Sequence, residues 1–140
     1  MSGFEMNISL DHLPSVKRDT IARVVSEIMK FEQVAMVILF GSYARGDYVE
    51  DPVGNDEDGH PYFSDLDICV LVDKARKARR IERSNSLRVK LREVSDIRVS
   101  VIAHTVSQFN KALEAGEYFY VDVVKEGVQL ANQCKFQSPG

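Results

Sequence analysis

Apolar residues recur along the chain with two different periods, and each period predicts a type of secondary structure. Residues 14–30 carry apolar positions at roughly helical spacing with charged residues between them, which predicts a helix. Those apolar positions are Val16, Ile21, Val24, Val25 and Ile28. Residues 34–40 and 65–72 are short, continuous apolar runs, and each is typical of a buried strand.

The second half of the chain continues the alternation of helices and strands. Residues 74–94 are charged with a helical pattern, and residues 96–103 alternate as a third strand does. Thr105 and Gln108 have the form of a capping box, so a helix is expected to follow them, and residues 117–127 predict a second short helix. This order of elements predicts an α/β (α+β) fold, in which helices pack on a small mixed sheet.

An acidic insertion at about residues 47–63 separates the first two predicted strands. Its Pro and Gly residues, and the absence of Lys and Arg between residues 47 and 60, predict a loop. The insertion contains Asp47, Glu50, Asp51, Asp56, Glu57 and Asp58. Two interpretations stay open: a solvated surface loop, or a loop in which Asp56, Glu57 or Asp58 supplies a metal ligand.

Composition sets the class of protein without naming a partner. The chain has 140 residues, of which 44% are hydrophobic and 28% charged, so we expect one domain over residues 1–140. A net charge of −3 gives no general argument for nucleic-acid or membrane binding, and no apolar run approaches the roughly 20 residues that span a bilayer. Cys69 and Cys134 are far apart and indicate no disulfide framework, which favours a cytoplasmic location.

The first candidate for chemistry is a pair of carboxylates at the start of the second predicted strand. Asp65 and Asp67 are two residues apart, so a strand would project both to one face. Like charges on a pocket wall normally need a cation, and Mg²⁺ prefers carboxylate oxygens. The alternative is a solvated strand end, because Asp-x-Asp is a common short motif.

The second candidate is the Gly-Ser turn that follows the first predicted strand. Gly41 has no side chain, so a ligand could approach the backbone there. Ser42 would begin a helical turn, where exposed N–H groups favour an anion, and Arg45 is near enough to add positive charge. An ordinary strand-to-helix connection is the alternative. The turn and the carboxylate pair together indicate a nucleotide and metal site.

These residues carry a family resemblance. "LFGSYARGD" followed by "SDLDICVLV" resembles the nucleotidyltransferase superfamily of the DNA polymerase β type, in particular its minimal nucleotidyltransferase branch. The resemblance implies that Gly41 and Ser42 hold the phosphates of a nucleoside triphosphate, usually ATP, while Asp65 and Asp67 bind Mg²⁺. It also implies that a hydroxyl attacks the α-phosphorus and pyrophosphate leaves.

The chain departs from that family pattern at the third carboxylate, which helps to bind one metal ion. Ser100 stands at the matching position, and Asp96 is the candidate substitute on the same predicted strand face. The expected catalytic residues are therefore Asp65, Asp67 and Asp96. The alternative is a binding module whose site no longer catalyses transfer.

The resemblance also bears on partners. Residues 101–130 are similar to a bacterial subgroup joined to a HEPN domain, which implies a HEPN toxin as partner, this chain as antitoxin, and a toxin tyrosine as acceptor. A more distant alternative acceptor is a small molecule such as an aminoglycoside. Aromatic residues 118–120 belong either to the core or to an interface, including one in a homo-oligomer. The basic run at residues 74–83 is either an electropositive binding face or a solvated helix, and nucleic acid is not expected as a direct substrate.

Overall fold

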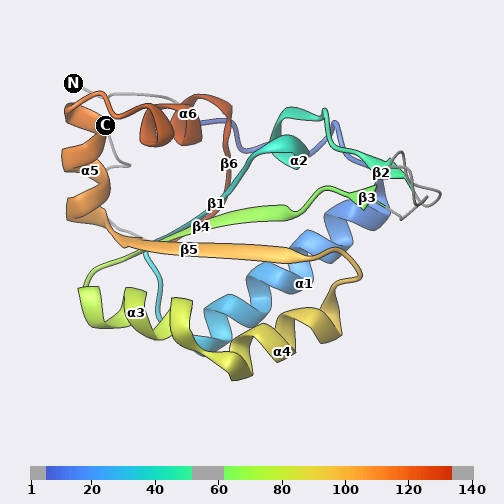
Figure 1. Cartoon of the computed structure of the whole chain (residues 1–140), viewed down its shortest axis with the longest axis horizontal. Helices are drawn as coiled ribbons and strands as arrows, with labels where there is room; N and C mark the ends of the chain where they lie inside the picture. The colour runs from blue at the N-terminus through green and yellow to red at the C-terminus, as the bar shows by residue number, and fades with distance from the viewer. Residues whose placement is uncertain (1–5, 52–61, 134–140) are drawn as a thin grey trace.

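The computed structural model describes residues 6–51 and 62–133, in which a four-stranded mixed sheet carries helices on both faces (Figure 1). The strand order is β5-β4-β1-β6. The strands are β1 Met36–Phe40, β4 Leu66–Val72, β5 Val99–Thr105 and β6 Val128–Asn132. β1 runs antiparallel to both β4 and β6, whereas β4 and β5 are parallel. The predicted fold class is confirmed.

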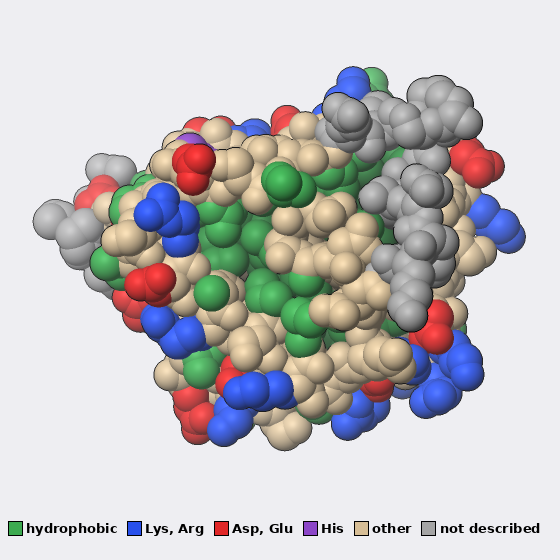
Figure 2. All heavy atoms as spheres, turned by 180° about the vertical axis from the view of Figure 1, so that it is seen from behind, with side chains coloured by type: hydrophobic (Ala, Val, Ile, Leu, Met, Phe, Trp, Pro, Cys, Tyr) green, Lys and Arg blue, Asp and Glu red, His purple; other side chains and the backbone are tan. Residues whose placement is uncertain are grey.

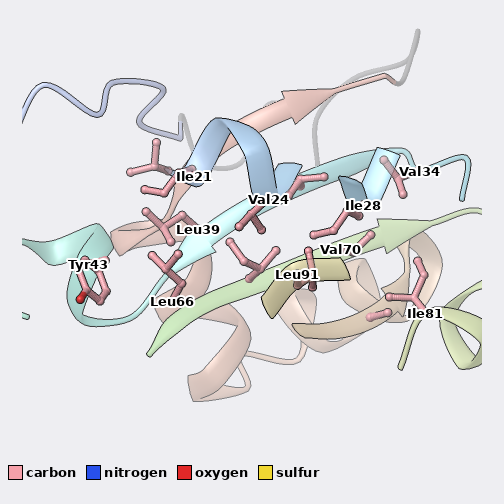
Figure 3. Close-up of a cluster of buried hydrophobic side chains, with 14 of the residues drawn as sticks. Ile21, Val24, Ile28, Val34, Leu39, Tyr43, Leu66, Val70, Ile81 and Leu91 are labelled. Carbon is pink, nitrogen blue, oxygen red and sulfur yellow. The ribbon is translucent and has the colours of Figure 1, made fainter. Parts of the chain in front are cut away.

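One face of the sheet, here called the sealed face, is covered by three helices. They are α1 Ser15–Phe31, α3 Ala75–Arg83 and α4 Asn85–Val94. Ile21, Val24 and Ile28 of α1 are almost fully buried against alternate residues of β1 and β4, as Figure 3 shows. Val16 is the exception to the predicted apolar stripe, because it is 67% exposed while Thr20 is buried.

The other face, here called the open face, is covered over only part of its area. Helices α5 (Val106–Glu114) and α6 (Tyr118–Glu126) pack Phe109, Leu113 and Val123 against it. The strand register places the open-face side chains in three cross-strand rows. These rows are Met36–Leu71–His104, Ile38–Cys69–Ile102 and Phe40–Asp67–Ser100. The third row, called the outer row, is half-buried at every position, whereas Met36, Leu71, Ile38 and Cys69 in the other two are fully buried.

Two short strands lie at the ends of the predicted acidic loop. β2 Glu50–Asp51 and β3 Tyr62–Phe63 pair as an antiparallel ladder, while the short helix α2 Ser42–Arg45 precedes them. The acidic residues of the loop that were considered as metal ligands, Asp56, Glu57 and Asp58, lie outside the described residues.

Three predicted elements differ from the structure. The helical segment 74–94 is two helices, because Ser84 ends α3 and its hydroxyl accepts from Leu87 N–H to cap α4. The third strand starts at Val99 rather than Asp96, and it continues to Thr105. β6 was not predicted, since its short run after Gly127 becomes a strand only by pairing with β1.

Further local predictions are confirmed. Thr105 and Gln108 form the capping box of α5, and α6 ends at Gly127. Cys69 is fully buried, and burial raises the pKa of its thiol to about 12. Cys134 lies outside the described residues. Across the described ranges, no helix has both the length and the apolar character needed to cross a membrane.

Candidate functional site

The Gly-Ser turn and the carboxylate pair meet at the outer row of the sheet. Phe40 pairs with Asp67 in the β1–β4 ladder, so Gly41 follows directly beside the Asp67 carboxylate. Gly41 has φ 77° and ψ −157°, a conformation that side chains rarely adopt, and a Cβ placed there would overlap Asp67 Oδ2. The position therefore needs glycine for two reasons: its backbone angles and its contact with a carboxylate.

Ser42 begins α2 immediately after that contact. The backbone N–H groups of Arg45 and Gly46 bond to Gly41 O and Ser42 O, which closes the short turn. Ser42 is half-buried, and its hydroxyl makes no hydrogen bond to another described residue. The hydroxyl and the first N–H groups of α2 are thus available to an anion beside Asp67.

A buried tyrosine holds α2 in place. Tyr43 is fully buried, stacks on Tyr48 at 4.3 Å between ring centroids, and donates its hydroxyl to Glu50 Oε2 at 2.8 Å. Burial and the Glu50 carboxylate raise the pKa of Tyr43. Lys17 pairs with Glu50 at 2.6 Å, and the Tyr43 carbonyl accepts from His12 Nε2 at 2.8 Å. This support joins segments distant in the chain, so no local sequence pattern predicts it.

The charge of Asp65 acts on the carboxylate of Asp67. Partial burial of Asp67, and then the nearby charge of Asp65, raise the pKa of Asp67, while Arg45 opposes that shift. Arg98 lies 4.0 Å from Asp65 Oδ2 but is largely exposed. A carboxylate that is held half-buried next to a second carboxylate is poised to bind a cation, because the cation would relieve both the burial and the repulsion.

Arg45 already has acidic partners within the protein. Its guanidinium lies 3.2 Å from Asp47 and 3.3 Å from Glu126, and both carboxylates raise its pKa. The Glu126 contact connects α2 to the end of α6. A phosphate would have to compete with these two carboxylates for the guanidinium.

The predicted place of Asp96 is wrong. Asp96 lies in the bend before β5 and is exposed, whereas Ser100 is the β5 residue beside Asp67. The charges that shift the pKa of Asp67 are those of Asp65 and Arg45, while Asp96 acts on Tyr43. A cavity of about 620 Å³ between β5 and helices α3 and α4 includes Asp96 but not the outer-row carboxylate. The alternation in the sequence could not show where the strand begins.

The carboxylate pair fits a Mg²⁺ site that is completed by a substrate. In the part of the chain that the structure describes, no three His, Cys, Asp or Glu residues come together as a metal cluster. Mg²⁺ is commonly held by one or two carboxylates together with water and substrate phosphates, so Asp65 and Asp67 would be a sufficient donor set beside the Gly-Ser turn. The roles of these residues as metal ligands stay a prediction.

Part of the basic run at residues 74–83 makes contacts within the protein. Lys77 pairs with Asp73 at 2.9 Å, and Arg80 pairs with Glu32 at 2.9 Å while lying 4.1 Å from the centre of the Phe31 ring. Figure 2 shows Lys and Arg side chains at the lower end of the molecule, where α3 and α4 lie in Figure 1. Exposed members of this basic surface include Arg76, Arg79, Arg83, Arg88 and Arg92.

A mixed sheet that joins a strand–Gly-Ser–helix turn to a carboxylate pair defines a nucleotidyltransferase-type domain. The family model described as "Polymerase beta, Nucleotidyltransferase" matches residues 23–133, and the chain belongs to this family. No curated protein matches the chain. Among solved structures, it is similar to a Sulfolobus solfataricus protein named as a candidate nucleotidyltransferase, with 20% identity, coverage of 90% of this chain and 95% of that chain, and a TM-score of 0.41.

Proposed function

We propose that this domain binds a nucleoside triphosphate, ATP in the first instance, with Mg²⁺ and transfers its nucleotidyl group to a hydroxyl acceptor. The observation that carries the proposal is the contact of Gly41 with Asp67, where an added Cβ would overlap the carboxylate oxygen. This contact puts a side-chain-free backbone turn against a half-buried carboxylate, as a phosphate bound to a carboxylate-held metal ion requires. Membership of the family supports the same reaction class.

Each residue of the site has a separate task. Gly41 and Ser42 bind the triphosphate through backbone N–H groups and a hydroxyl, and Asp65 and Asp67 would hold Mg²⁺. Bound Mg²⁺ supplies the positive charge that offsets the negative charge of the triphosphate and of the departing pyrophosphate. The acceptor oxygen forms a bond to the α-phosphorus as the bond from that phosphorus to the bridging oxygen breaks. The hydroxyl proton passes to water, because Ser100 offers no carboxylate base beside Asp67.

The acceptor proposed first is a tyrosine of a HEPN-type toxin, with this chain as its antitoxin in the cytoplasm. The support is the resemblance of residues 101–130 to that subgroup, together with the exposed aromatic side chains of α6. Tyr118 is 86% exposed and Phe119 is 40% exposed. Such a surface also suits an interface with a second copy of the chain.

A second candidate function is a binding module that blocks its partner without transferring a nucleotide. Two observations favour it: Ser100 takes the place beside Asp67 where the family usually has a carboxylate, and Arg45 is engaged by Asp47 and Glu126. A serine is a poor ligand for Mg²⁺, so this site holds the metal with fewer charges.

Label transfer separates the two functions. The protein is incubated with ATP labelled at the α-phosphate, Mg²⁺ and a candidate HEPN partner, and labelled protein is counted. Asp67→Asn should abolish transfer, while Asp73→Asn, a control at the other end of β4, should leave it unchanged. Tight complex formation with no label in any partner would favour the binding module. Full transfer by Asp67→Asn would contradict the role given to that carboxylate.

A further inference from the structure

The open face carries an aromatic pair beside the proposed phosphate site. We infer that Phe40 and Phe119 form a stacking site for the nucleobase of the bound nucleoside triphosphate. This inference rests on the proposed function and adds the part of the substrate that the Gly-Ser turn and the carboxylates leave unbound. It assigns a ligand-binding task to α6, in addition to its packing on the sheet and to the partner interface proposed above for its exposed aromatic side chains.

Phe40 connects the two parts of the substrate site. It directly precedes Gly41 and is the cross-strand partner of Asp67, so both side chains project from the same face. Cβ atoms of such neighbours lie about 5 Å apart. A nucleoside triphosphate whose phosphates contact Gly41 can therefore reach the Phe40 ring with its nucleoside.

Phe119 extends this aromatic surface from α6. Its ring meets Phe40 edge to face, with centroids 5.5 Å apart and an interplanar angle of 89°, and it meets Tyr120 at 5.2 Å and 88°. Tyr120 is fixed in turn by Phe109, at 5.3 Å between centroids. The Phe119 ring is thus held by two aromatic neighbours but is still 40% exposed, whereas Phe109 is fully buried.

The position of α6 is fixed at its other end as well. A Cβ added at Gly127 would overlap the Ile38 side chain and lie tightly against the Leu39 carbonyl, and Glu126 pairs with Arg45 of α2. Both ends of α6 thus contact β1, through Phe119 and Gly127, and its C-terminal end also contacts α2. Because the Phe119 ring sits on a fixed helix, it loses little conformational freedom when a ligand stacks on it, and this low entropy cost favours binding.

Stacking on an aromatic side chain suits any nucleobase, because every base has a π face. Phe40 lies beside Asp67 and the Gly-Ser turn, and it also contacts Phe119. Because the aromatic surface is thus continuous with the Gly-Ser turn, a nucleobase is a better occupant than a remote partner. The expected ligand is the purine ring of ATP or GTP, without strong preference between them.

Binding of two probes tests the inference. Calorimetry compares Mg-ATP with Mg-tripolyphosphate, which has the phosphates but no base, on the wild-type protein. We expect ATP to bind about tenfold more tightly, as one stacked base provides. Phe119→Leu should remove this preference and leave tripolyphosphate binding unchanged, while Phe119→Tyr should keep it. Tyr118→Leu is the control, because that exposed ring has no aromatic contact within the described residues.

Each result has a separate meaning. Equal binding of ATP and tripolyphosphate to the wild type overturns the stacking site and leaves the proposed function standing. An ATP preference that survives Phe119→Leu also overturns it, and light scattering then shows whether the ring instead holds two copies together. If neither probe binds the wild type, the proposed function fails and the stacking site fails with it.

Discussion

The two faces of the central sheet differ in how completely they are covered. On the sealed face, α1, α3 and α4 cover alternate residues of β4 from Leu66 to Val72, and these residues are fully buried. On the open face, α5 and α6 cover Cys69 and Leu71 but leave Asp67 half-buried. Adjacent residues of one strand thus have opposite tasks.

This difference shows how one strand can supply both core residues and a carboxylate of the candidate site. Side chains of neighbouring strand residues project to opposite faces, so Leu66 can belong to the core while Asp67 belongs to the site. The opposite face of β4 is packed against helices, so the strand holds the Asp67 carboxylate more firmly than a loop would. The carboxylate still reaches solvent. Substitution of a buried residue on the sealed face should therefore lower the stability of the folded protein, whereas substitution of Asp67 on the open face should not.

The largest effect is expected on the sealed face. Leu66→Ala should lower the free energy of unfolding by about 2–5 kcal/mol, because it removes a fully buried side chain and leaves a cavity. Ser100→Ala, a small change in the outer row, should shift it by less than about 1 kcal/mol. Urea denaturation measures both, and equal losses would contradict the division between the faces.

The glycine beside Asp67 should be the next most sensitive position. Gly41→Ala is expected to cost about 1–3 kcal/mol for its backbone conformation and more for its overlap with Asp67, with loss of ATP binding. Gly116→Ala is the matched control, since Gly116 has φ 74° but nothing within 4 Å of an added Cβ. Thermal denaturation and ATP titration of both variants isolate the overlap. If Gly116→Ala is equally harmful, backbone strain alone explains the effect.

Asp67 should make the folded protein less stable at neutral pH. The pKa of Asp67 is raised above its ordinary value of 3.8 in the folded state. The contribution of Asp67 to the stability of the folded protein is therefore fully present below pH 3.8 and is lost as the pH rises through the folded pKa. Asp67→Asn should therefore raise the melting temperature at pH 7, and the gain should shrink toward pH 4. Mg²⁺ should raise the melting temperature of the wild type more than that of the variant. A gain that is independent of pH would show that ionisation is not the cause.

The smallest effect is expected from the exposed pair between α2 and α6. Glu126→Gln removes one of two carboxylates that compete with phosphate for Arg45, so tripolyphosphate should bind a few-fold more tightly at low salt. Glu93→Gln, which alters an exposed pair with Lys90, should leave that affinity unchanged. Weaker binding by Glu126→Gln would instead indicate that Glu126 orients the guanidinium.

The sequence by itself determined the features that depend on near neighbours. The apolar run before Gly41, the capping box at Thr105 and the stop at Gly127 are local signals, and each is confirmed. Asp65, just before β4, lies near enough to Asp67 for its charge to raise the pKa of Asp67, and the binding roles of the two residues stay predictions. Family membership is shown by the family model, which matches residues 23–133.

Only the tertiary structure decided which distant residues meet. The pairing of β6 with β1 and the contact of Phe119 with Phe40 depend on strand register and helix packing, whereas the place of Ser100 beside Asp67 was expected from the family resemblance and is confirmed by the register. Alternation within one segment does not reveal where a strand begins, and for that reason Asp96 was placed wrongly. Register is set by the sum of many contacts between distant segments, which no short stretch of sequence contains.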